Sequence, residues 1–401
     1  MAGPLHGVRV VDVTSILLGP YASQLLGDLG ADVIKIEAPP KGDSTRYLGP
    51  SRSAGMSGPF INLNRNKRSL ALDLKQPAAK DALRRLTKTA DVFLHNMRPN
   101  AIGRLGFGYD DVVKLKPDIV YCGAYGYSQK GPYRAKPAYD DLIQGASGYA
   151  ALAARLGDEP RFAPTVIADK LVGLTTSHMI LAALFHRQRT GEGQFVEVPM
   201  FETMVSFLMV EHLYAKTFEP PLGPTGYARL MTPWRKPYRT KDGYVCILPY
   251  SDKQWAGFFE IAGRPQLKAD PRFKDHSTRT THVDAIYRIL AEAMLEKSTE
   301  DWVRLAESVE IPVAKVNDLD DLLEDEHLKA VGLFQSFEHP TEGRVKLSGP
   351  PAAFSKTPAG IARQAPRFGE NGAELLRELG YSEAEVASLR DSGALVEGEP
   401  K

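Results

Sequence analysis

Basic side chains surround one short apolar stretch of this chain in a pattern that suits phosphate groups. Four of them stand within eleven positions around a predicted strand, Leu70 to Leu74: Arg65, Lys67, Arg68 and Lys75. Arg98 and Arg104 follow a second predicted strand. Ligands of parallel sheets gather beyond the carboxyl ends of the strands, where Lys and Arg bind phosphates. A solvated charged face would produce the same pattern, so the cluster predicts one or the other.

Other motifs give little support for metal or serine-nucleophile chemistry. The nine histidines are scattered, and none has a metal-ligand spacing. Cys122 and Cys246 are the only cysteines, which supports neither a disulfide framework nor a cysteine-based zinc site. A G-x-S-x-G elbow is missing. Gly103, Gly106 and Gly108 have the wrong order for a phosphate loop and are interpreted as turns and helix ends. We expect no metal site.

The first forty residues predict the element that positions a site. Val8 to Val13 is a β-branched run, Gly19 and Pro20 break it, Tyr21 to Leu29 has helical spacing, and Val33 to Ile36 is a second apolar run. This is a βαβ unit, the start of a parallel sheet. The turn TSILLGP lacks G-x-G-x-x-G, so the backbone cannot approach a pyrophosphate there, although Glu37 stands where a ribose-binding acid often lies. We expect a Rossmann-like fold without a nicotinamide or flavin cofactor.

Alternating patterns continue to about Phe218 and predict a wound parallel sheet. Further predicted strands are Val92 to His95, Ile119 to Ala124 and Phe195 to Val198; predicted helices are Lys80 to Thr87, Ala101 to Leu105, Tyr109 to Leu115 and Asp169 to Arg189. A linker rich in proline and glycine follows, from Pro220 to Pro237.

After this linker, the sequence pattern changes to one that predicts a smaller α+β domain. Asp242 and Gly243 form a hairpin turn. Three amphipathic helices are predicted at Lys253 to Ala262, Val283 to Leu295 and Thr299 to Ser308. A strand at Val345 to Leu347 and a helix at Gly372 to Leu379 are expected to return to the first domain.

Composition is that of an ordinary globular protein. The 401 residues carry a formal net charge of +1, which gives no reason to expect nucleic acid as a partner. The sequence shows neither a long apolar N-terminal segment nor a membrane span, so we expect a cytoplasmic protein with no membrane partner. An organelle matrix is the alternative.

Five segments in order resemble the class III CoA-transferases, the family of formyl-CoA transferase, succinate–hydroxymethylglutarate CoA-transferase and the carnitine CoA-transferases. They are GPYASQLLGDLGADVIKIEAP, LNRNKRSLALDLK, DVFLHNMRPNAIGRLGFGYDDV, YDDLIQGASG and RTGEGQFVEVPMFE. The resemblance covers nearly the whole chain and is strongest before residue 210. A related branch, the α-methylacyl-CoA racemases, shares much of the pattern.

The resemblance implies a homodimer of interlocked rings. Its large Rossmann-like domain would be built from both chain ends, at 1–218 and 326–401, with a linker at 219–237 and a small domain at 238–325. It also implies an acyl-CoA and a carboxylic acid as substrates, CoA as the shared group, and no tightly bound cofactor.

The family's catalytic aspartate corresponds to Asp169 in VIADKLVGL. The resemblance implies that this carboxylate attacks a thioester and forms an anhydride and then an aspartyl-CoA thioester. Without the resemblance, an aspartate at a helix start is interpreted as an N-cap. The family's racemases carry a histidine where this chain has Tyr139, followed by Asp140. Tyr139 would hydrogen-bond a carboxylate or thioester oxygen. Asp140 would orient Asp169 or the acceptor acid, or act as a buried structural cap.

Binding residues follow from the same resemblance. The implied CoA contacts are Leu72, Lys75, Asn96, Met97 and Arg104. Surface charge and core packing are the alternatives for these residues. Ala38 replaces a frequent arginine, and His95 stands where relatives have glutamate, so we interpret His95 as structural.

Substrate positions are less well defined. Leu17 replaces the glutamine of formyl-CoA transferase, which argues against formate or oxalate. Arg229 and Arg235 in the linker are candidates for a distal carboxylate and Trp234 for an acyl cover, with packing on a partner chain as the alternative. The function expected is CoA transfer; an acyl-CoA racemase or a non-catalytic CoA-binding protein is the alternative.

Overall fold

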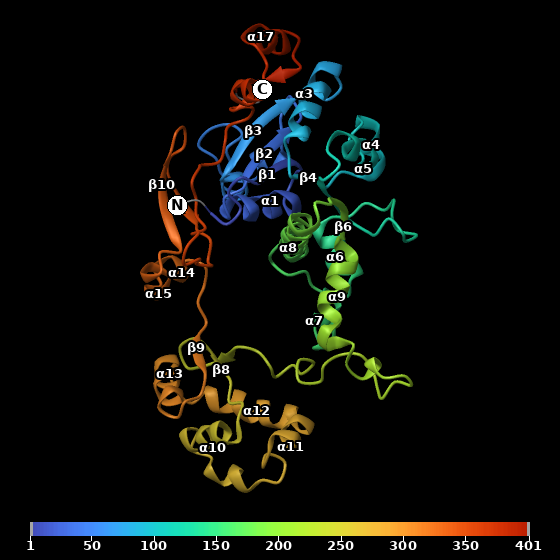
Figure 1. The fold of residues 1–401 in the computed structure, drawn as a ribbon. Helices are drawn as coiled ribbons and strands as arrows, with labels where there is room; N and C mark the ends of the chain where they lie inside the picture. The colour runs from blue at the N-terminus through green and yellow to red at the C-terminus, as the bar shows by residue number, and fades with distance from the viewer. Residues whose placement is uncertain (1–2, 399–401) are drawn as a thin grey trace. The chain divides into compact units, whose positions relative to one another are not determined.

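The computed structural model describes residues 3–398, which divide into two compact units (Figure 1). Unit 1 comprises the chain up to 148, residues 162–207, and the chain from 328 onward; unit 2 comprises 149–161 and 208–327. The predicted boundaries were 218, 237 and 325. The structure therefore groups 149–161 and the whole predicted linker, 219–237, with the smaller unit.

A seven-stranded sheet forms the centre of unit 1, in the order β12-β3-β2-β1-β4-β5-β6. The strands are β1 (Arg9–Val13), β2 (Asp32–Glu37), β3 (Lys67–Leu72), β4 (Val92–His95), β5 (Val120–Tyr125), β6 (Gln194–Pro199) and β12 (Leu395–Val396). All neighbours are parallel except β12, which pairs antiparallel with β3. The predicted parallel sheet and the returning tail are confirmed. The strand order reverses between β1 and β4, which is where such sheets bind ligands.

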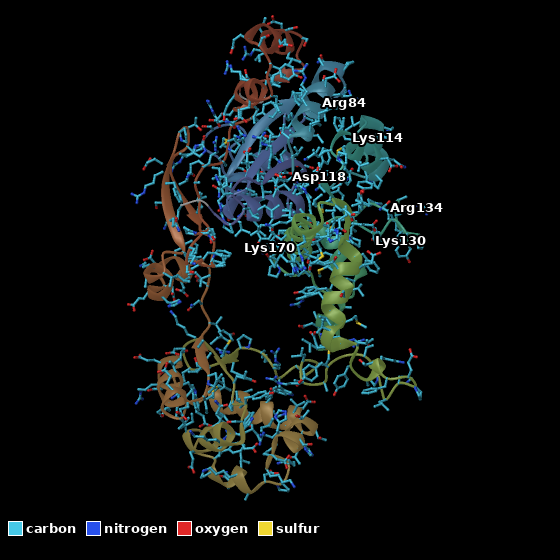
Figure 2. All side chains as sticks on the ribbon, in the orientation of Figure 1. Arg84, Lys114, Asp118, Lys130, Arg134 and Lys170 are labelled. Atoms are coloured by element: carbon cyan, nitrogen blue, oxygen red, sulfur yellow. The ribbon has the colours of Figure 1, made fainter. Side chains whose placement is uncertain are left out.

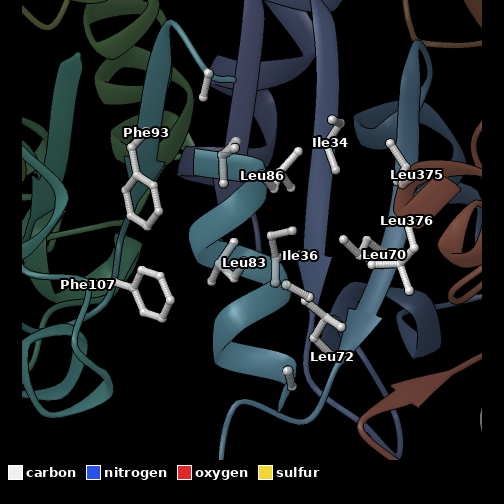
Figure 3. Close-up of a cluster of buried hydrophobic side chains, with 14 of the residues drawn as sticks. Ile34, Ile36, Leu70, Leu72, Leu83, Leu86, Phe93, Phe107, Leu375 and Leu376 are labelled. Carbon is white, nitrogen blue, oxygen red and sulfur yellow. The ribbon is translucent and has the colours of Figure 1, made fainter. Parts of the chain in front are cut away.

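Helices cover both faces of this sheet. They are α1 (Leu18–Asp28), α2 (Gly58–Asn64), α3 (Pro77–Lys88), α4 (Pro99–Leu105), α5 (Tyr109–Leu115), α6 (Asp140–Ala146), α8 (Ile167–Thr190), α16 (Gly372–Glu378) and α17 (Glu383–Asp391), with the short helix η1 (Ser44–Tyr47). On one face, Leu83 and Leu86 of α3 and Leu375 and Leu376 of α16 join a core with the strands (Figure 3). The sequence analysis missed α2, α6, α17 and η1.

Helices α1 and α8 pack against each other over the opposite face. Helix α1 begins at Leu18, so Gly19 and Pro20 lie in its first turn and do not break the chain as predicted. Proline is tolerated there because the first N–H groups of a helix have no intrahelical acceptor. Gly173 of α8 permits the close approach, since a Cβ at that position would lie 2.7 Å from the Leu18 carbonyl oxygen.

Among the described residues, α8 alone is long and apolar enough to cross a membrane, with a mean hydropathy of 1.2. The sequence analysis recognised no such segment. Only the length and the composition of α8 suggest a membrane span, and the core helices of soluble proteins share both features. The finding is therefore weak evidence for a membrane span.

Unit 2 holds a three-stranded antiparallel sheet and a cluster of helices. Its elements are α7 (Ala151–Arg155), η2 (Tyr214–Thr217), β7 (Tyr238–Arg239), β8 (Tyr244–Ile247), α10 (Asp252–Ile261), η3 (Pro265–Ala269), α11 (His276–Thr281), α12 (Val283–Met294), α13 (Thr299–Ser308), β9 (Val313–Lys315) and α14 (Asp321–Glu324). Helices α9 (Met200–His212) and α15 (Glu326–Ala330) cross the unit boundaries, and β10 (Phe334–His339) pairs with β11 (Gly343–Ser348) in unit 1. The predicted hairpin turn and the three amphipathic helices are confirmed, the helices to within one residue at each end.

Most of the basic cluster around β3 is neither a phosphate pocket nor a charged surface. Three of its four residues are buried in ion pairs: Arg65 with Asp28 at 2.7 Å, Lys67 with Asp12 at 3.2 Å, and Arg68 with Asp32 at 2.7 Å. Both interpretations of these three residues were wrong. Their carboxylate partners come from β1, α1 and β2, and nothing in the local sequence pattern shows that pairing.

Two further ion pairs are buried beside Lys67. Lys35 lies 2.8 Å from Asp43, and Arg46 lies 2.6 Å from Glu37, with all four side chains at most 1% exposed. Arg46 also lies over the Phe60 ring at 3.8 Å. Buried charges are costly unless each is paired, so this network is intolerant of losing one member.

We expect Asp43→Asn to destabilise the protein by about 3–5 kcal/mol, because it leaves the Lys35 ammonium buried without its nearest counter-charge. Urea unfolding followed by circular dichroism measures the change. Lys253→Gln is the control, since it breaks an exposed ion pair with Glu310 and should leave the unfolding midpoint unchanged. An equally small effect of Asp43→Asn would show that the buried pair does not support the fold.

Candidate active site

A cavity of about 260 Å³ lies where the strand order of the large sheet reverses. It is formed by residues that follow β1, β4 and β5, by the loop before α6, and by the first turns of α8 and α9: Ser15, Ile16, Leu17, Leu18, Asn96, Met97, Arg98, Pro99, Ala124, Tyr125, Gly126, Gln129, Arg134, Lys136, Pro137, Ala138, Tyr139, Asp169 and Met200. All of them belong to unit 1.

The loop after β1 is held from several sides. Asn96 brackets Ser15, accepting from its N–H at 3.1 Å and donating to its carbonyl at 2.8 Å. Lys35 donates to the Thr14 carbonyl at 2.9 Å. The Ile16 N–H donates to the buried Asp43 carboxylate at 3.1 Å. The buried ion pairs therefore reach the wall of the cavity.

This wall includes an unusual backbone conformation. Ile16 has φ = 72°, in the left-handed region that β-branched residues rarely adopt. Such a residue persists only where its surroundings determine it, at a cost of about 1–3 kcal/mol. The hydrogen bonds to Ser15 and Ile16 hold Ile16 in this conformation, and they direct the first turn of α1 toward the cavity.

Asp169 also lines the cavity, as the third residue of α8. The N-cap of this helix is Val166, so the N-cap interpretation of Asp169 was wrong. The backbone N–H of Asp169 donates to the buried Asp140 carboxylate at 2.9 Å. Gln144 donates to the same carboxylate and accepts from the Ala163 N–H at 2.8 Å. Asp140 and Gln144 thus fix the chain that leads into α8.

The side chain of Asp169 is left free by this arrangement. Within residues 3–398 its carboxylate has neither a hydrogen bond nor an ion pair. Burial, together with the negative charges of Asp140 and Asp141, raises the pKa of Asp169 from 3.8 to about 7. A half-buried carboxylate without a partner is a reactive group, and strongly shifted pKa values are typical of functional sites.

Cations surround the rest of the cavity. Arg98, Arg134 and Lys136 line it, and none has a carboxylate partner among the described residues. Lys136 lies over the Tyr133 ring at 3.5 Å, and Arg134 extends from the same loop (Figure 2). Asp169 is the one acidic residue in the described lining. The cavity therefore suits an anionic ligand.

The described residues contain no group of three or more His, Cys, Asp or Glu side chains that could hold a metal ion. The chemistry available from the described side chains is that of a nucleophilic carboxylate in a cavity that also contains three cations.

Comparison with known proteins decides which family the chain belongs to. Residues 5–372 match the model of CoA-transferase family III. The chain is 32% identical to a succinyl-CoA:glutarate CoA-transferase of Mus musculus, over 99% of this chain and 92% of that protein. It is 31% identical to a succinate–glutarate CoA-transferase of Agrobacterium fabrum, over 94% and 96%. A CAIB/BAIF family protein from Brucella suis has a similar structure, with a TM-score of 0.79, 29% identity, and coverage of 94% and 100%.

The chain belongs to CoA-transferase family III. The family expected from the five sequence segments is therefore confirmed, and with it the assignment as a CoA-transferase.

The cavity of this CoA-transferase brings together five of the residues expected from the sequence. Asp169, Tyr139, Leu17, Asn96 and Met97 all line it. Tyr139 is largely exposed, whereas the side chain of Asn96 is committed to Ser15. Asp140 lies directly behind Asp169 and is buried. Their roles in catalysis and binding remain predictions.

Three expected CoA contacts lie outside the cavity. Lys75 follows β3 and Arg104 ends α4, both exposed. Leu72 is fully buried in the core of unit 1 (Figure 3). The contact of Leu72 with an adenine stays a prediction. It is not favoured, because the buried side chain is not accessible to a ligand.

His95 occupies the end of β4 and is fully buried. Burial lowers its pKa to about 4, so the imidazole is neutral at physiological pH. Its Nε2 lies 3.4 Å from the Tyr125 hydroxyl, and its Nδ1 has no hydrogen-bond partner in the described structure. Burial suits the interpretation of His95 as structural, but the expected full hydrogen bonding of its ring is contradicted by the partnerless Nδ1.

The substrate candidates of the linker belong to unit 2. Arg229 donates from Nε to the Tyr287 hydroxyl at 3.2 Å. Arg235 lines a separate cavity of about 470 Å³ that also includes Cys246. Trp234 packs against the core of this unit, beneath the guanidinium of Arg288.

Sequence analysis missed several residues of the site. Ile16, Gln129, Arg134, Lys136 and Met200 line the cavity without having been singled out. Two of them were detectable, because Arg134 and Lys136 directly precede the Tyr139-Asp140 segment. The strained Ile16 carries no sequence signal.

We expect Asp169→Asn to stabilise the protein at pH 8 by up to about 4 kcal/mol, at about 1.4 kcal/mol for each unit of raised pKa. Since the folded pKa of about 7 exceeds the unfolded value, stability falls as pH rises from about 4 to 7. The asparagine variant escapes this loss and should match the wild type at pH 4. Thermal unfolding at both pH values measures the effect. Asp391→Asn, at an exposed position, is the control, and equal melting curves at pH 8 would contradict the raised pKa.

Proposed function

We propose that this chain transfers CoA from an acyl-CoA donor to a carboxylic acid through covalent intermediates on Asp169. The observation that carries the proposal is the unpartnered Asp169 carboxylate in a cavity whose other charged residues are Arg98, Arg134 and Lys136. A carboxylate of raised pKa is a stronger nucleophile than an ordinary one once it is deprotonated. The three cations suit the phosphates of CoA.

The proposed reaction has four steps, and each step forms one bond to an acyl carbon and breaks another. The Asp169 carboxylate attacks the thioester carbonyl, the C–S bond breaks, and CoA leaves as a thiolate, which gives a mixed anhydride. The thiolate attacks the aspartyl carbonyl, releasing the donor acid and forming aspartyl-CoA. The acceptor carboxylate then attacks aspartyl-CoA and expels the thiolate. Attack of the thiolate on the acceptor's acyl carbonyl completes the product and restores Asp169.

Neighbouring residues have supporting roles in this proposal. Asp140 is a positioning residue, because it holds the backbone of Asp169. Tyr139 donates a hydrogen bond to the thioester or carboxylate oxygen. Lys75 and Arg104 stay candidates for the 3′-phosphate of CoA, and Asn96 and Met97 for its pantetheine side. Because the relatives compared here are named for succinate or succinyl-CoA with glutarate, we propose succinyl-CoA and glutarate as the first pair to test.

We expect hydroxylamine to trap an aspartyl adduct at Asp169 when the protein is incubated with succinyl-CoA, as detected by peptide mass spectrometry. Trapping should increase between pH 6 and pH 8 as the carboxylate loses its proton. Asp169→Ala should abolish trapping and transfer while still binding CoA, and Asp391→Asn should behave as wild type. Near-normal turnover of Asp169→Ala would exclude the covalent route.

The same incubations distinguish the racemase alternative. A racemase needs an acid and a base on opposite faces of the α-carbon. The described cavity lining contains no histidine. A 2-methylacyl-CoA should therefore gain no deuterium from deuterated water, and incorporation as fast as CoA transfer would favour the racemase.

We propose that the protein works as a cytoplasmic homodimer of interlocked chains. Unit 1 exposes large apolar side chains on α8, where Leu174 and Phe185 are 53% and 60% exposed, and on α6, where Leu142 is 52% exposed. Large exposed apolar patches usually contact another protein or a membrane, and these side chains are candidates for such a patch. A second copy would cover it and would also explain why α8 resembles a membrane span.

We expect a species of about twice the 44.0 kDa chain mass in sedimentation at nanomolar concentration, because interlocked chains cannot separate on dilution. Phe185→Asp should weaken assembly, whereas Leu48→Asp, at another exposed apolar position of unit 1, should not. A folded 44.0 kDa species, or sedimentation with phospholipid vesicles, would contradict the proposal.

A further inference from the structure

Unit 2 contains a small cavity of its own that the proposed reaction does not use. The cavity has a volume of about 40 Å³ and lies between the linker, the loop before α10, and helices α11 and α12. Every residue of its described lining belongs to unit 2, and none of them is acidic. The polar part of the lining consists of Arg229, Tyr250, His276, Arg279, Thr280 and Tyr287.

Arg279 is the buried arginine of this lining, with 5% of its surface exposed. One terminal nitrogen donates to the Phe273 carbonyl at 2.9 Å, and the other contacts the Asp252 carboxylate. The Nε of Arg279 is buried and has no acceptor in the described structure. A buried N–H group without an acceptor is costly, so a ligand that accepts from this nitrogen would be favoured.

Arg229 lines the same cavity from the linker and is held by aromatic residues. Its guanidinium donates to the Tyr287 hydroxyl at 3.2 Å, interacts with the Tyr227 hydroxyl, and lies 5.5 Å from the centre of the Tyr250 ring. These contacts fix the guanidinium without neutralising its charge. Among residues 3–398, Arg229 has no carboxylate partner.

The two arginines together leave one positive charge without a counter-charge. Asp252 balances Arg279, whereas nothing in the described part of the chain balances Arg229. A ligand with a single negative charge would therefore neutralise the cavity. A dianion such as sulfate would leave a negative charge in excess, and excess charge in a half-buried site is costly.

We infer that this cavity binds one small monovalent anion. Arg229 supplies a charged donor, and the buried Nε–H of Arg279 supplies a donor that is otherwise unused. The cavity volume of about 40 Å³ is roughly three times the 10–15 Å³ that a single water needs. This space holds a halide with a water, or a planar anion such as nitrate.

The bound anion would join separate elements of unit 2, because Arg229 belongs to the linker and Arg279 belongs to α11. A ligand that binds only the folded state stabilises it in proportion to the logarithm of its concentration. The stability of unit 2 should therefore depend on which small anion is present, independently of any CoA transfer.

Tryptophan fluorescence measures this effect on the full-length protein. The three tryptophans of the chain, Trp234, Trp255 and Trp302, all belong to unit 2, so their emission follows the unfolding of this unit. At equal ionic strength, chloride, bromide or nitrate at ten times its Kd should raise the melting temperature by about 4 °C through binding to the cavity. Gluconate, which is too large for the cavity, is the reference anion.

Arg229→Gln separates binding in the cavity from general salt effects, which act on every variant. The variant should lose the anion-dependent rise or need at least tenfold more anion to reach it. Arg239→Gln is the matched control, since Arg239 is an exposed arginine of unit 2 outside the cavity, and it should respond as wild type. The same anion dependence in wild type and Arg229→Gln would overturn the inference, as would a wild-type melting temperature that is equal in all salts.

Two further measurements decide the kind of anion and its position. If sulfate produced an Arg229-dependent rise as large as that of chloride and nitrate, the monovalent assignment would be wrong. Crystals of the wild-type protein soaked in sodium bromide should show anomalous density between Arg229 and Arg279. Bromide density confined to other places, without an Arg229-dependent effect of nitrate, would exclude the site even if the variant failed to fold.

Discussion

The site of this CoA-transferase depends on charges buried at the carboxyl end of β1, in the middle of β2 and at the start of β3. Asp12 pairs with Lys67 and Lys35 with Asp43, and all four side chains are almost fully buried. Burial alone would raise the pKa of Asp43, but Lys35 and the donors of Thr45 outweigh it and keep that pKa below its usual value. The stably charged carboxylate can therefore hold Ile16 in its strained conformation, so the network determines the shape of the cavity.

Asp169 shows the opposite use of burial. Its carboxylate has no cation or donor to compensate for the loss of water, and the nearby Asp140 and Asp141 make ionisation harder still. Asp140 nevertheless contributes by holding the backbone of Asp169. The same protein thus uses paired charges for rigidity and one unpaired charge for reactivity, at some expense of stability.

Much of unit 1 could be predicted from the sequence. The spacing of apolar residues shows which face of a helix is buried, and the buried strands of a parallel sheet are continuous apolar runs. Strand β4 and helix α5 were predicted to the residue. The errors at the basic cluster have a common cause, which is pairing over long sequence separations. The basic residues around β3 looked solvent-facing or phosphate-binding because their partners, such as Asp12 and Asp32, lie elsewhere in the chain. The free state of Asp169 likewise depends on what surrounds it and is not encoded locally.

The antiparallel pairing of β12 with β3 has a consequence for how the protein is made. The last strand, Leu395–Val396, completes a sheet whose first strand is Arg9–Val13, whereas unit 2 ends at residue 327. During synthesis from the N-terminus, every residue of the smaller unit leaves the ribosome before the larger one is complete. Until β12 has left the ribosome, β3 exposes an unpaired edge, and such edges invite association with other chains. Unit 1, which carries Asp169, is therefore the last unit to complete its sheet in each newly made chain.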